Sequence, residues 1–558
     1  MAQKNTFSYQ TRKENISNIE NKNFDLLIIG GGITGAGIAL DAVKRGMKVA
    51  LVEKNDFAWG TSSRSTKLIH GGLRYLKQLE IALVKEVGTE RAIVHHNAPH
   101  LVIPEKMLLP IVKKGSLGKF STSIGLAVYD FLAGVKSSER RKMLSKEETK
   151  KSEPLLNTEK LIAGALYYEY RSDDARLTIE IMKKAVGYGA VCLNYAEAHE
   201  LLLENDKIAG VRIFDHIEQN NFNIKASKIV NAAGPWVDLL RKKDNSLQGK
   251  RLQLTKGVHL VVAHEKLPIK QAVYFDVKDG RMIFVIPRNG KTYIGTTDTV
   301  YNKEIDHPQT TAEDANYLLD AVNKMFPSVN LKMSHIESTW AGLRPLIHED
   351  GKSPSELSRK DEIFISDSGL ISIAGGKLTG YRKMAERVVN LVARQIRKET
   401  DKKFKKSSTE NEKLCGGNFE NQQAITDYII RLTGEAKQIK LNVNHIKDWV
   451  YKYGTNSDEI LDIAYNIYKE EKLEADLLAI SAEIIYGIRH EMVVSLADFM
   501  IRRTGRLYFE RPKIKIFINE LEAILKEHIP VDADFHKTQS KEFWEEYEAV
   551  MSFEKVVE

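Results

Sequence analysis

The sequence predicts an α/β protein that also carries an antiparallel sheet and ends in a helical region. A continuous apolar run at 25–29, followed at once by glycines and a helical pattern, is typical of a parallel strand buried on both faces. Alternating apolar residues and turn dipeptides fill 251–299, which indicates antiparallel strands. Apolar residues recur at helical spacing in 460–468 and 473–485, so the last part of the chain is expected to be mainly α-helical.

The first glycine-rich stretch has the spacing of a phosphate-binding turn. Gly30, Gly32 and Gly35 form G-x-G-x-x-G, which permits a tight turn, close approach to a pyrophosphate and close packing of helix on strand. The helix that begins here directs unpaired N–H groups and its positive dipole end at the phosphates. The next strand, 48–52, ends at Glu53, whose carboxylate would bind an adenosine ribose and disfavour a 2′-phosphate. The pattern predicts dinucleotide binding without NADP.

Two later segments are predicted to reach the same ligand. Residues 226–236 form a strand that runs into a small-residue turn, where a ligand or a neighbouring backbone can come close. A second glycine-rich stretch, 375–385, follows the strand-like run 369–374 and begins another helix. Two such stretches more than three hundred residues apart indicate a flavoprotein.

Small hydroxyl residues follow Glu53, and they are predicted either to bind pyrophosphate or ribityl oxygens or only to cap the loop. The complete set of predicted cofactor contacts is Gly30, Gly32, Gly35, Glu53, Thr61, Ser62, Ser63, His70, Gly71, Gly72, Ala233, Gly234, Gly375, Gly376, Lys377, Leu378 and Thr379.

Composition narrows the class of protein. The 558 residues suffice for two or three domains, and no apolar run is long enough to span a bilayer. The N-terminal residues 1–23 lack the apolar core of a secretory signal, so the protein is expected to stay in the cytoplasm. Two cysteines support neither disulfides, nor a cysteine-based zinc site, nor an iron–sulfur cluster, and no metal is expected. The net charge of +8 favours anionic partners, but nucleic acid is disfavoured because no nucleic-acid-binding signature occurs.

Several motifs, taken together and in order, resemble one family, the FAD-dependent glycerol-3-phosphate dehydrogenases and their sister α-glycerophosphate oxidases. The segments that carry the resemblance are 29–46, 67–76, 230–236, 295–298, 342–346, 375–385 and 495–505. The resemblance implies a Rossmann-type FAD-binding domain interwoven with an antiparallel substrate sheet, and oxidation of sn-glycerol 3-phosphate to dihydroxyacetone phosphate.

The substrate's phosphate calls for a cage of guanidinium or ammonium groups. The resemblance places Arg344, expected in a turn before Pro345, and Arg359 at the substrate, together with Arg74, the adjacent Tyr75 and Lys377. The alternative for any single arginine is a surface salt bridge. Lys377 is predicted either to stabilise the negative charge of reduced flavin or only to contact a phosphate.

A histidine is predicted as the base that accepts the hydroxyl proton. His259, expected at the start of a strand, is preferred because imidazole titrates near working pH. His70, which precedes two glycines, is the second candidate, and it can instead pack against the flavin or be its covalent attachment point. For either histidine a purely structural role remains open.

The motifs do not separate a dehydrogenase that reduces quinone from an oxidase that reduces oxygen. The resemblance implies a central insertion in the oxidases, and the modest length of 304–334 favours the dehydrogenase. A quinone reductase must meet the membrane, and the basic, partly apolar segment 113–136 with Arg140 and Arg141 is the predicted contact with an anionic surface on the inner face of the cell membrane. The alternative is a solvated face over a core helix.

Two other classes stay open: a non-catalytic nucleotide-binding regulator, and an amine or imino-acid oxidase on the same scaffold. A homodimer is also left open. The predicted organisation is a FAD-binding part in three pieces, 22–97, 166–248 and 353–398, a substrate- or membrane-facing insertion at 98–165, an antiparallel substrate domain at 249–352, a linker at 399–412 and a helical C-terminal domain at 413–558. Within the insertion, residues 98–154 are rich in Lys and Arg and are expected to be less regular.

Overall fold

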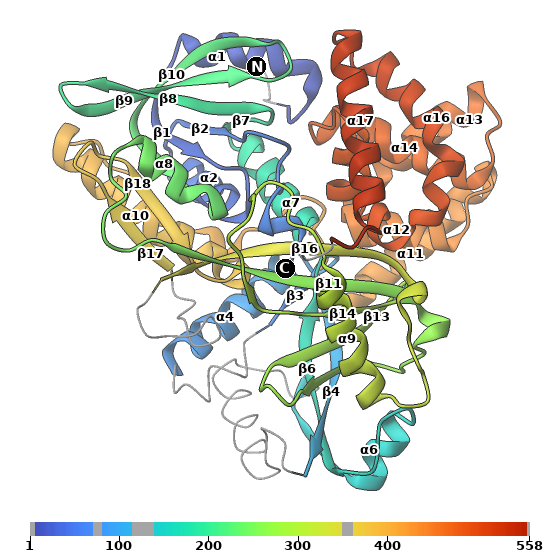
Figure 1. The fold of residues 1–558 in the computed structure, drawn as a ribbon. Helices are drawn as coiled ribbons and strands as arrows, with labels where there is room; N and C mark the ends of the chain where they lie inside the picture. The colour runs from blue at the N-terminus through green and yellow to red at the C-terminus, as the bar shows by residue number, and fades with distance from the viewer. Residues whose placement is uncertain (1–5, 71–80, 114–138, 349–360, 555–558) are drawn as a thin grey trace.

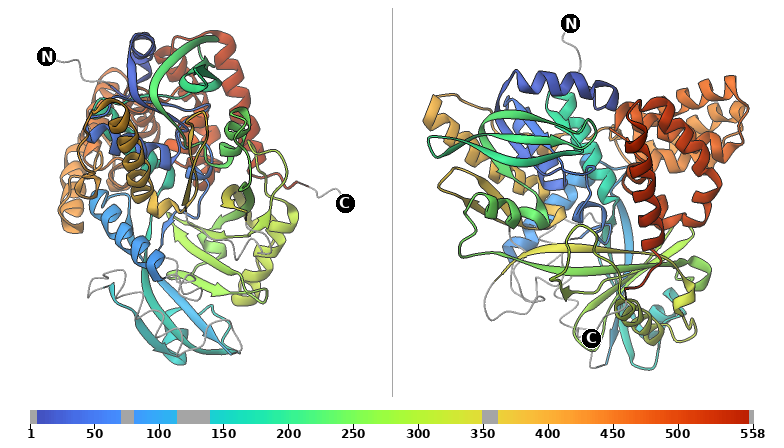
Figure 2. Two further views of the ribbon diagram at one scale, coloured as in Figure 1. Left: turned by 90° about the vertical axis from the view of Figure 1, so that its left-hand side faces the viewer. Right: turned by 45° about the horizontal axis from the view of Figure 1, so that its top comes forward.

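The computed structural model describes residues 6–70, 81–113, 139–348 and 361–554. Two sheets lie one above the other in the view of Figure 1, and the C-terminal helices stand beside the upper sheet. The right-hand view of Figure 2 shows the same arrangement, with the C-terminal helices grouped on one side of the first sheet. The predicted fold class is therefore confirmed.

The first sheet is built around the parallel strands that the sequence predicts. Its strand order is β17-β18-β10-β1-β2-β7, and β8 and β9 extend β10 as an antiparallel ribbon. The pairs β1–β10, β1–β2, β2–β7 and β10–β18 are parallel. The strands are β1 Asn23–Ile29, β2 Val49–Val52, β7 Val191–Leu193, β8 Ala196–Glu204, β9 Lys207–Asp215, β10 Asn220–Asn231, β17 Asp361–Ile365 and β18 Ile371–Gly375.

Helices cover both faces of this sheet. On one face, α2 (Ile33–Lys44), α7 (Asp174–Gly187) and α10 (Tyr381–Thr400) bury apolar side chains against β1 and β2. On the other face, α1 (Arg12–Glu20) packs with the β8–β10 ribbon. Burial on both faces explains why β1 is a continuous apolar run rather than an alternating one.

The second sheet is mainly antiparallel, with the order β15-β11-β14-β13-β12-β4-β6-β3, β16 beside β11 and β5 beside β6. Only the β12–β4 pair of those in the described residues is parallel. Helix α9 (Ala312–Met325) packs its apolar face against β11. The strands are β3 Leu68–Ile69, β4 Ile103–Val112, β5 Lys142–Ser145, β6 Leu161–Arg171, β11 Leu252–Ala263, β12 Ala272–Asp276, β13 Met282–Arg288, β14 Lys291–Gly295, β15 Thr299–Val300 and β16 Ile336–Ile347.

The sequence indicated little regular structure between 98 and 154, and this was wrong. The ten-residue strand β4 pairs with β6 along its whole length, and β5 pairs with β6 on the other side. Two prolines, Pro104 and Pro110, and a continuous apolar run hid the strand from a search for alternation. The insertion therefore contributes strands to the second sheet, while the domain boundaries stay predictions.

The C-terminal part is helical, as predicted. Helices α11 to α14 enclose one apolar core, and the later helices share a second core with the antiparallel sheet. The helices of this part are α11 Gln422–Ala436, α12 Val443–Tyr453, α13 Ser457–Glu470, α14 Ala475–His490, the π-helix η11 Asp498–Arg503, α15 Arg506–Phe509, α16 Arg511–His528 and α17 Ala533–Ala549. Three helices from earlier in the chain are α4 Ile81–Asn97, α6 Lys146–Ser152 and α8 Val237–Lys243.

Candidate cofactor and substrate site

A deep cleft opens at the carboxyl ends of the parallel strands β1, β2, β10 and β18. It holds about 1580 Å³ of space free of protein atoms, part of it open to solvent. Ligands of open α/β sheets bind in this position, because the strand ends and the helix N-termini that follow them meet there.

The first glycine motif shapes one wall of the cleft. Gly30 has φ +117°, and a Cβ on it would lie 2.5 Å from the carbonyl oxygen of Ala232. A Cβ on Gly35 would lie 1.9 Å from the carbonyl oxygen of Gly30, so only glycine lets α2 pack this closely on the turn. Gly32 is the N-cap of α2, which directs the N–H groups of its first turn, none of which has a partner within the helix, at this region.

Glu53 lies at the end of β2, where the sequence predicted a ribose contact, and it lines the cleft. Its carboxylate accepts hydrogen bonds from the backbone N–H groups of Gly31 at 2.7 Å and Asn55 at 3.0 Å. Burial raises the pKa of this carboxyl, and the two N–H groups offset part of that rise. The acid is therefore held in a fixed orientation beside the glycine turn.

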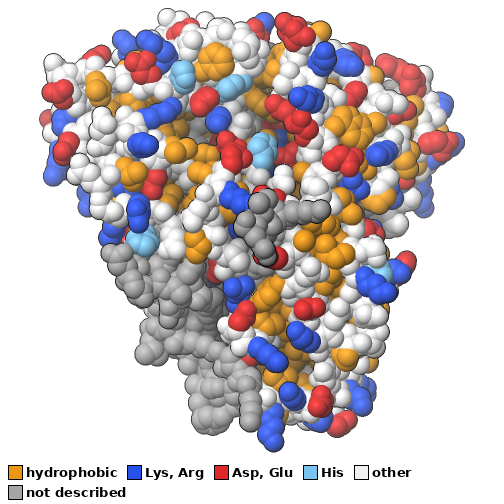
Figure 3. All heavy atoms as spheres, in the orientation of Figure 1, with side chains coloured by type: hydrophobic (Ala, Val, Ile, Leu, Met, Phe, Trp, Pro, Cys, Tyr) orange, Lys and Arg blue, Asp and Glu red, His pale blue; other side chains and the backbone are white. Residues whose placement is uncertain are grey.

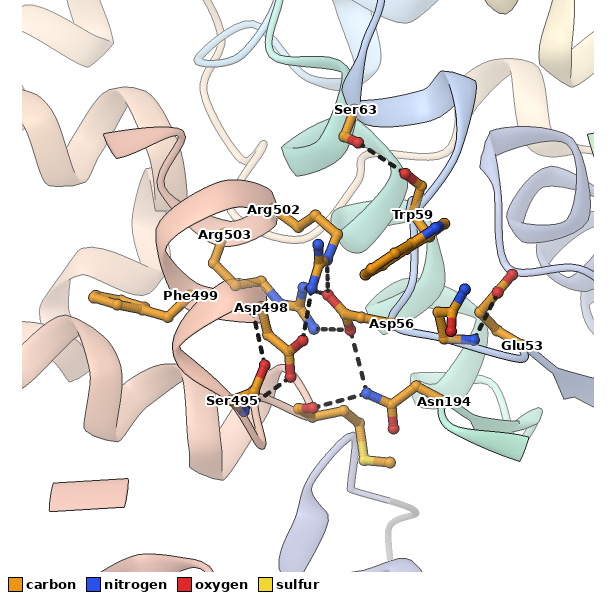
Figure 4. A network of polar contacts seen from close by, with 12 residues as sticks. Glu53, Asp56, Trp59, Ser63, Asn194, Ser495, Asp498, Phe499, Arg502 and Arg503 are labelled. Atoms are coloured by element: carbon orange, nitrogen blue, oxygen red, sulfur yellow. Dashed lines mark hydrogen bonds and ion pairs between the residues drawn. The ribbon is translucent and has the colours of Figure 1, made fainter. Parts of the chain in front are cut away.

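Residues 53–63, which connect β2 to the short helix η2 (Thr61–Ser63), are called here the cleft loop. The hydroxyl of Ser62 accepts a hydrogen bond from the N–H of Ile33 at 3.0 Å, and that of Thr61 donates to the carbonyl of Leu343 at 2.6 Å. The loop thus bridges the N-terminus of α2 and strand β16 of the second sheet. The Ser63 hydroxyl donates within the loop to the carbonyl of Trp59, as Figure 4 shows.

The second glycine pair forms another wall. Gly375 and Gly376 have φ of +76° and +80°, which glycine adopts without strain. A Cβ on Gly376 would lie 2.5 Å from Sδ of Met384. Lys377 and Leu378 follow and line the cleft. The predicted approach of both glycine-rich stretches to one space is therefore what the fold produces.

Arg344 lies on the second sheet, directly before Pro345, and is not itself among the lining residues of the cleft. Its guanidinium donates to the carbonyl of Thr297 at 3.2 Å and to the hydroxyl of Thr296 at 3.1 Å, and it pairs with Asp298 at 3.1 Å. A Cβ on Gly257 would lie 2.3 Å from a guanidinium nitrogen, so this glycine on β11 leaves the room that the guanidinium occupies.

The predicted turn at Arg344 is wrong, because both Arg344 and Pro345 belong to strand β16. Among the described residues β16 pairs only with β11, so it is an edge strand. Proline, which has no backbone N–H to donate, is tolerated in such a strand because one of its edges makes no ladder hydrogen bonds. Pro345 itself lines the cleft. The strand therefore brings the arginine and the cleft wall together.

His259 lies in the middle of β11 rather than at its start, and it is almost fully buried. Its Nε2 lies 3.0 Å from the hydroxyl of Thr66, and its ring stacks on Trp340 with centroids 4.7 Å apart. Burial, together with the positive charges of Arg344 and Lys67, lowers the pKa of His259 well below its ordinary value. His259 is not among the residues that line the cleft.

Apart from Arg344 and His259, the predicted cofactor and substrate residues divide into three groups according to their position relative to the cleft. Those that line the cleft are Gly30, Gly32, Glu53, Thr61, Ser62, Ala233, Gly234, Gly375, Gly376, Lys377 and Leu378. Those that are described but lie outside its lining are Gly35, Ser63, His70 and Thr379. Those outside the described residues are Gly71, Gly72, Arg74, Tyr75 and Arg359. His70 lies against Phe284, with ring centroids 5.9 Å apart.

The predicted site residues left out several lining residues, among them Trp59, Gly60, Glu197, Lys243 and, at the end of the predicted segment 226–236, Trp236. Gly60 is required by the structure, since a Cβ there would lie 2.8 Å from the Trp236 ring, but its only signal in the sequence is a glycine among the small residues that follow Glu53. Glu197 has no such signal, because it comes from the exposed ribbon β8–β9 and joins the cleft only through tertiary packing.

Comparison with known proteins identifies the class. The family model described as FAD dependent oxidoreductase matches residues 25–382, and the model described as C-terminal domain of alpha-glycerophosphate oxidase matches residues 407–534. The chain therefore belongs to the FAD-dependent oxidoreductases.

Full-length relatives narrow the family. Aerobic glycerol-3-phosphate dehydrogenase of Bacillus subtilis is 54% identical over 505 residues, which cover 90% of this chain and 91% of that protein. The Staphylococcus aureus protein of the same name is 51% identical over 547 residues, covering 97% and 96%. The chain belongs to the family of aerobic glycerol-3-phosphate dehydrogenases, which confirms the resemblance inferred from the motifs.

Solved structures agree. The glycerol-3-phosphate dehydrogenase from Bacillus halodurans, complexed with FAD, is 44% identical with a TM-score of 0.84, and the match covers 99% of this chain and all of that one. The L-alpha-glycerophosphate oxidase from Mycoplasma pneumoniae is 19% identical with a TM-score of 0.55 over 70% of this chain, and it shares the fold.

The residues of the cleft fit a flavin dinucleotide. Glycine is required at the two positions where a side chain would fill the phosphate turn, and the half-buried acid Glu53 stands where an adenosine ribose would lie. The two glycine-rich stretches line one continuous cleft that reaches from Glu53 on the first sheet to Pro345 on the second.

Proposed function

We propose that this protein oxidises sn-glycerol 3-phosphate to dihydroxyacetone phosphate with FAD and passes the electrons to a membrane quinone. The observation that carries the proposal is a single cleft that both glycine-rich stretches line and that reaches Pro345 on the second sheet, the strand neighbour of the half-buried Arg344. Membership of the aerobic glycerol-3-phosphate dehydrogenases supports the choice of substrate.

Each wall of the cleft has a distinct task in this proposal. The first turn of α2, beginning after Gly32, holds the pyrophosphate, and Glu53 binds the ribose of the AMP half. Lys377, after the second glycine pair, stabilises negative charge at the flavin ring. When bound, FAD supplies the hydride acceptor that oxidation of a secondary alcohol requires.

Arg344 is proposed to bind the substrate phosphate. Asp298 and Thr296 hold its guanidinium in one orientation, so a bidentate contact with an anion would cost little further ordering. Replacement Arg344→Ala should lower kcat/KM for glycerol 3-phosphate at least about a hundredfold, as loss of a charged contact predicts. FAD content, read from the flavin absorbance, should not change.

Arg344→Lys is the matched variant, since it keeps the charge but not the planar fork, and it should recover only part of the activity. Turnover of Arg344→Ala at the wild-type rate would remove Arg344 from the substrate site. A regulator without enzymatic activity would have no turnover to lose.

His259 remains the proposed base, and its surroundings make the proposal testable by pH. A base must be unprotonated to act, and the pKa of His259 is lowered by burial and by neighbouring positive charges. The acid limb of the kcat/KM profile should therefore lie below pH 6.5, the ordinary histidine value. His259→Gln should abolish that limb along with most turnover.

A limb at pH 7 or above that persists in His259→Gln would assign the base to another group, of which His70 is the second candidate. The measurement is steady-state turnover with a soluble acceptor between pH 5 and pH 9.

The proposed reaction is tested first by anaerobic mixing of the purified flavoprotein with sn-glycerol 3-phosphate. Bleaching of the flavin band, followed by fast reoxidation with a soluble quinone and slow reoxidation in air, is the expected result. Fast reoxidation in air with formation of peroxide would identify an oxidase. If the flavin band bleached with an amino acid but not with glycerol 3-phosphate, the proposed substrate would be wrong and an amine or imino-acid oxidase would be indicated.

Delivery of electrons to a quinone further implies that the protein binds the inner face of the cell membrane from the cytoplasm. Among the described residues no helix has both the length and the apolar character that crossing a bilayer needs. Basic and acidic side chains are interspersed over the face seen in Figure 3, so the net positive charge is not gathered there. Most of the predicted contact segment, 114–136, lies outside the described residues.

Salt-dependent binding to anionic vesicles tests this part of the proposal. Reversal of four charges to Glu at Lys113, Lys114, Arg140 and Arg141 should weaken binding, by roughly 1 kcal/mol per basic residue. The matched control reverses four exposed cations on α10 and the segment after it, Arg394, Arg397, Lys405 and Lys406. Loss of binding only in the control would move the membrane contact to α10. A homodimer is tested separately by sedimentation.

A further inference from the structure

The C-terminal motif 495–505 has no part in the function proposed above, yet its charged side chains are among the most deeply buried in the molecule. Its centre forms the π-helix η11, in which Asp498, Arg502 and Arg503 are each at most 2% exposed. The π-helix faces the cleft loop, as Figure 4 shows, although the two are more than four hundred residues apart in sequence.

Both arginines bind one carboxylate in the middle of the cleft loop. Nε of Arg502 donates to Asp56 at 2.5 Å, and the guanidinium of Arg503 donates to both oxygens of Asp56, at 2.6 and 2.8 Å. The amide of Asn194, which follows β7, donates to the same carboxylate at 3.2 Å. Asp56 itself is completely buried, so these contacts are shielded from solvent and salt.

The cluster is balanced in charge. Arg502 also pairs with Asp498 at 2.8 Å, so two arginines face two aspartates. Burial would raise the pKa of Asp56, but Arg503 and Arg502 outweigh burial and hold that pKa below its ordinary value. Removal of any one member leaves an uncompensated charge in the interior.

Arg502 differs from Arg503 because it also reaches the cofactor cleft. Its guanidinium carbon lies 4.8 Å from the centre of the Trp59 ring, a distance at which an arginine stacks on an aromatic face. Trp59 lines the cleft, together with its neighbours Gly60 and Thr61. Arg502 therefore contacts the loop at two points, the carboxylate of Asp56 and the wall residue Trp59.

We propose that Arg502 is a positioning residue for the cofactor, and that the C-terminal domain uses it to hold Trp59 and the cleft loop in the conformation that binds FAD. The C-terminal domain is thereby part of the cofactor site, although it supplies no lining residue to the cleft among the described residues. The proposal rests on the assignment of FAD to this cleft.

The test is the dissociation constant of FAD, measured by reconstitution of apoprotein of the full chain and read from quenching of flavin fluorescence. Arg502→Lys keeps the charge but loses the fork that spans Asp56 and Trp59. The matched control is Arg506→Lys. Arg506 is similarly buried and pairs with Glu483 at 2.6 Å, but none of its described ion pairs reaches the cleft loop.

Arg502→Lys should raise the FAD dissociation constant at least about tenfold, the scale of one lost charge-assisted hydrogen bond, whereas Arg506→Lys should change it less than about twofold. Thermal unfolding of the two apoproteins is compared in parallel. If Arg502 had a merely structural role, both variants would lose stability and their affinities for FAD would be the same. Equal dissociation constants for the two variants overturn the proposal.

A second pair of variants covers the case in which Arg502→Lys fails to fold. Trp59→Phe introduces no unpaired charge and should weaken FAD binding on its own, and wild-type affinity in this variant overturns the proposal. Where Arg502→Lys folds, its effect should shrink in the Trp59→Phe background, because both changes act through one contact. The assay needs no glycerol 3-phosphate, so it fails or succeeds independently of the proposed reaction.

Discussion

Two regions of the molecule hold the cleft loop from opposite sides, and they do so by different means. On the side of the glycine turn, backbone N–H groups of Gly31 and Ile33 donate to Glu53 and Ser62. On the side of the C-terminal domain, two buried arginines donate hydrogen bonds to the carboxylate of Asp56. The first anchor depends on the absence of side chains, and the second depends on a balanced set of charged ones. The first anchor should therefore be disrupted by adding a side chain, and the second by removing a charge.

The largest effect is expected at the glycine anchor. Gly35→Ala places a Cβ 1.9 Å from the carbonyl oxygen of Gly30, and backbone cannot move aside as a flexible side chain would. The free energy of unfolding should fall by more than about 5 kcal/mol, or no folded flavoprotein should form. Chemical denaturation followed by circular dichroism measures it.

Gly434→Ala, in helix α11, is the control for Gly35→Ala. A Cβ there meets nothing within 4 Å, so the change should be neutral or should stabilise the helix by up to about 1 kcal/mol. Similar stabilities for the two variants would show that the close approach of α2 to Gly30 does not prevent a side chain at position 35.

The next effect in size is expected at the charged anchor. Asp56→Ala leaves Arg502 and Arg503 buried with one carboxylate between them, which should cost about 3–5 kcal/mol of stability. Glu545→Ala removes the exposed partner of Lys541 and should change stability by less than about 0.5 kcal/mol. Denaturation midpoints of the two variants measure the difference. A small loss for Asp56→Ala would mean that water enters the cluster.

The smallest effect separates binding from stability at Glu53. Glu53→Gln should weaken FAD binding about tenfold, since a ribose hydroxyl loses a charged acceptor. The pKa of this carboxyl is raised by burial, so the folded apoprotein binds its proton more tightly than the unfolded chain does. Apoprotein stability should therefore fall as pH rises from 4.5 through the raised value, and Glu53→Gln should remove that dependence.

Glu197→Gln is the matched control, because Glu197 also lines the cleft but pairs with the half-exposed His216. It should change neither FAD affinity nor the pH dependence of stability by a comparable amount. A tenfold loss of affinity in both variants would indicate that the general charge of the cleft, and not the position of Glu53, governs binding.

Prediction from the sequence succeeded where a short stretch of chain specifies its own geometry. Gly30, Gly35 and Glu53 lie within one strand–helix–strand unit, so their spacing alone placed the glycine turn and the acid at the same edge of the sheet. It failed where a pattern was ambiguous or a partner was remote. The prolines of β4 concealed a strand that β6 supports along its length, and Arg344 was assigned to a turn because proline follows it.

The sequence by itself determined the α/β class, the cofactor turn and the family, because each follows from local spacing and from motifs that persist in order along the chain. Only the tertiary structure decided that Asp56 meets Arg502 and Arg503, that Trp59 becomes a wall of the cleft, and that His259 is buried with a lowered pKa. The reason is physical. A charged side chain carries no local signal of its partner, and burial, which sets its energy and its pKa, exists only once distant segments pack together.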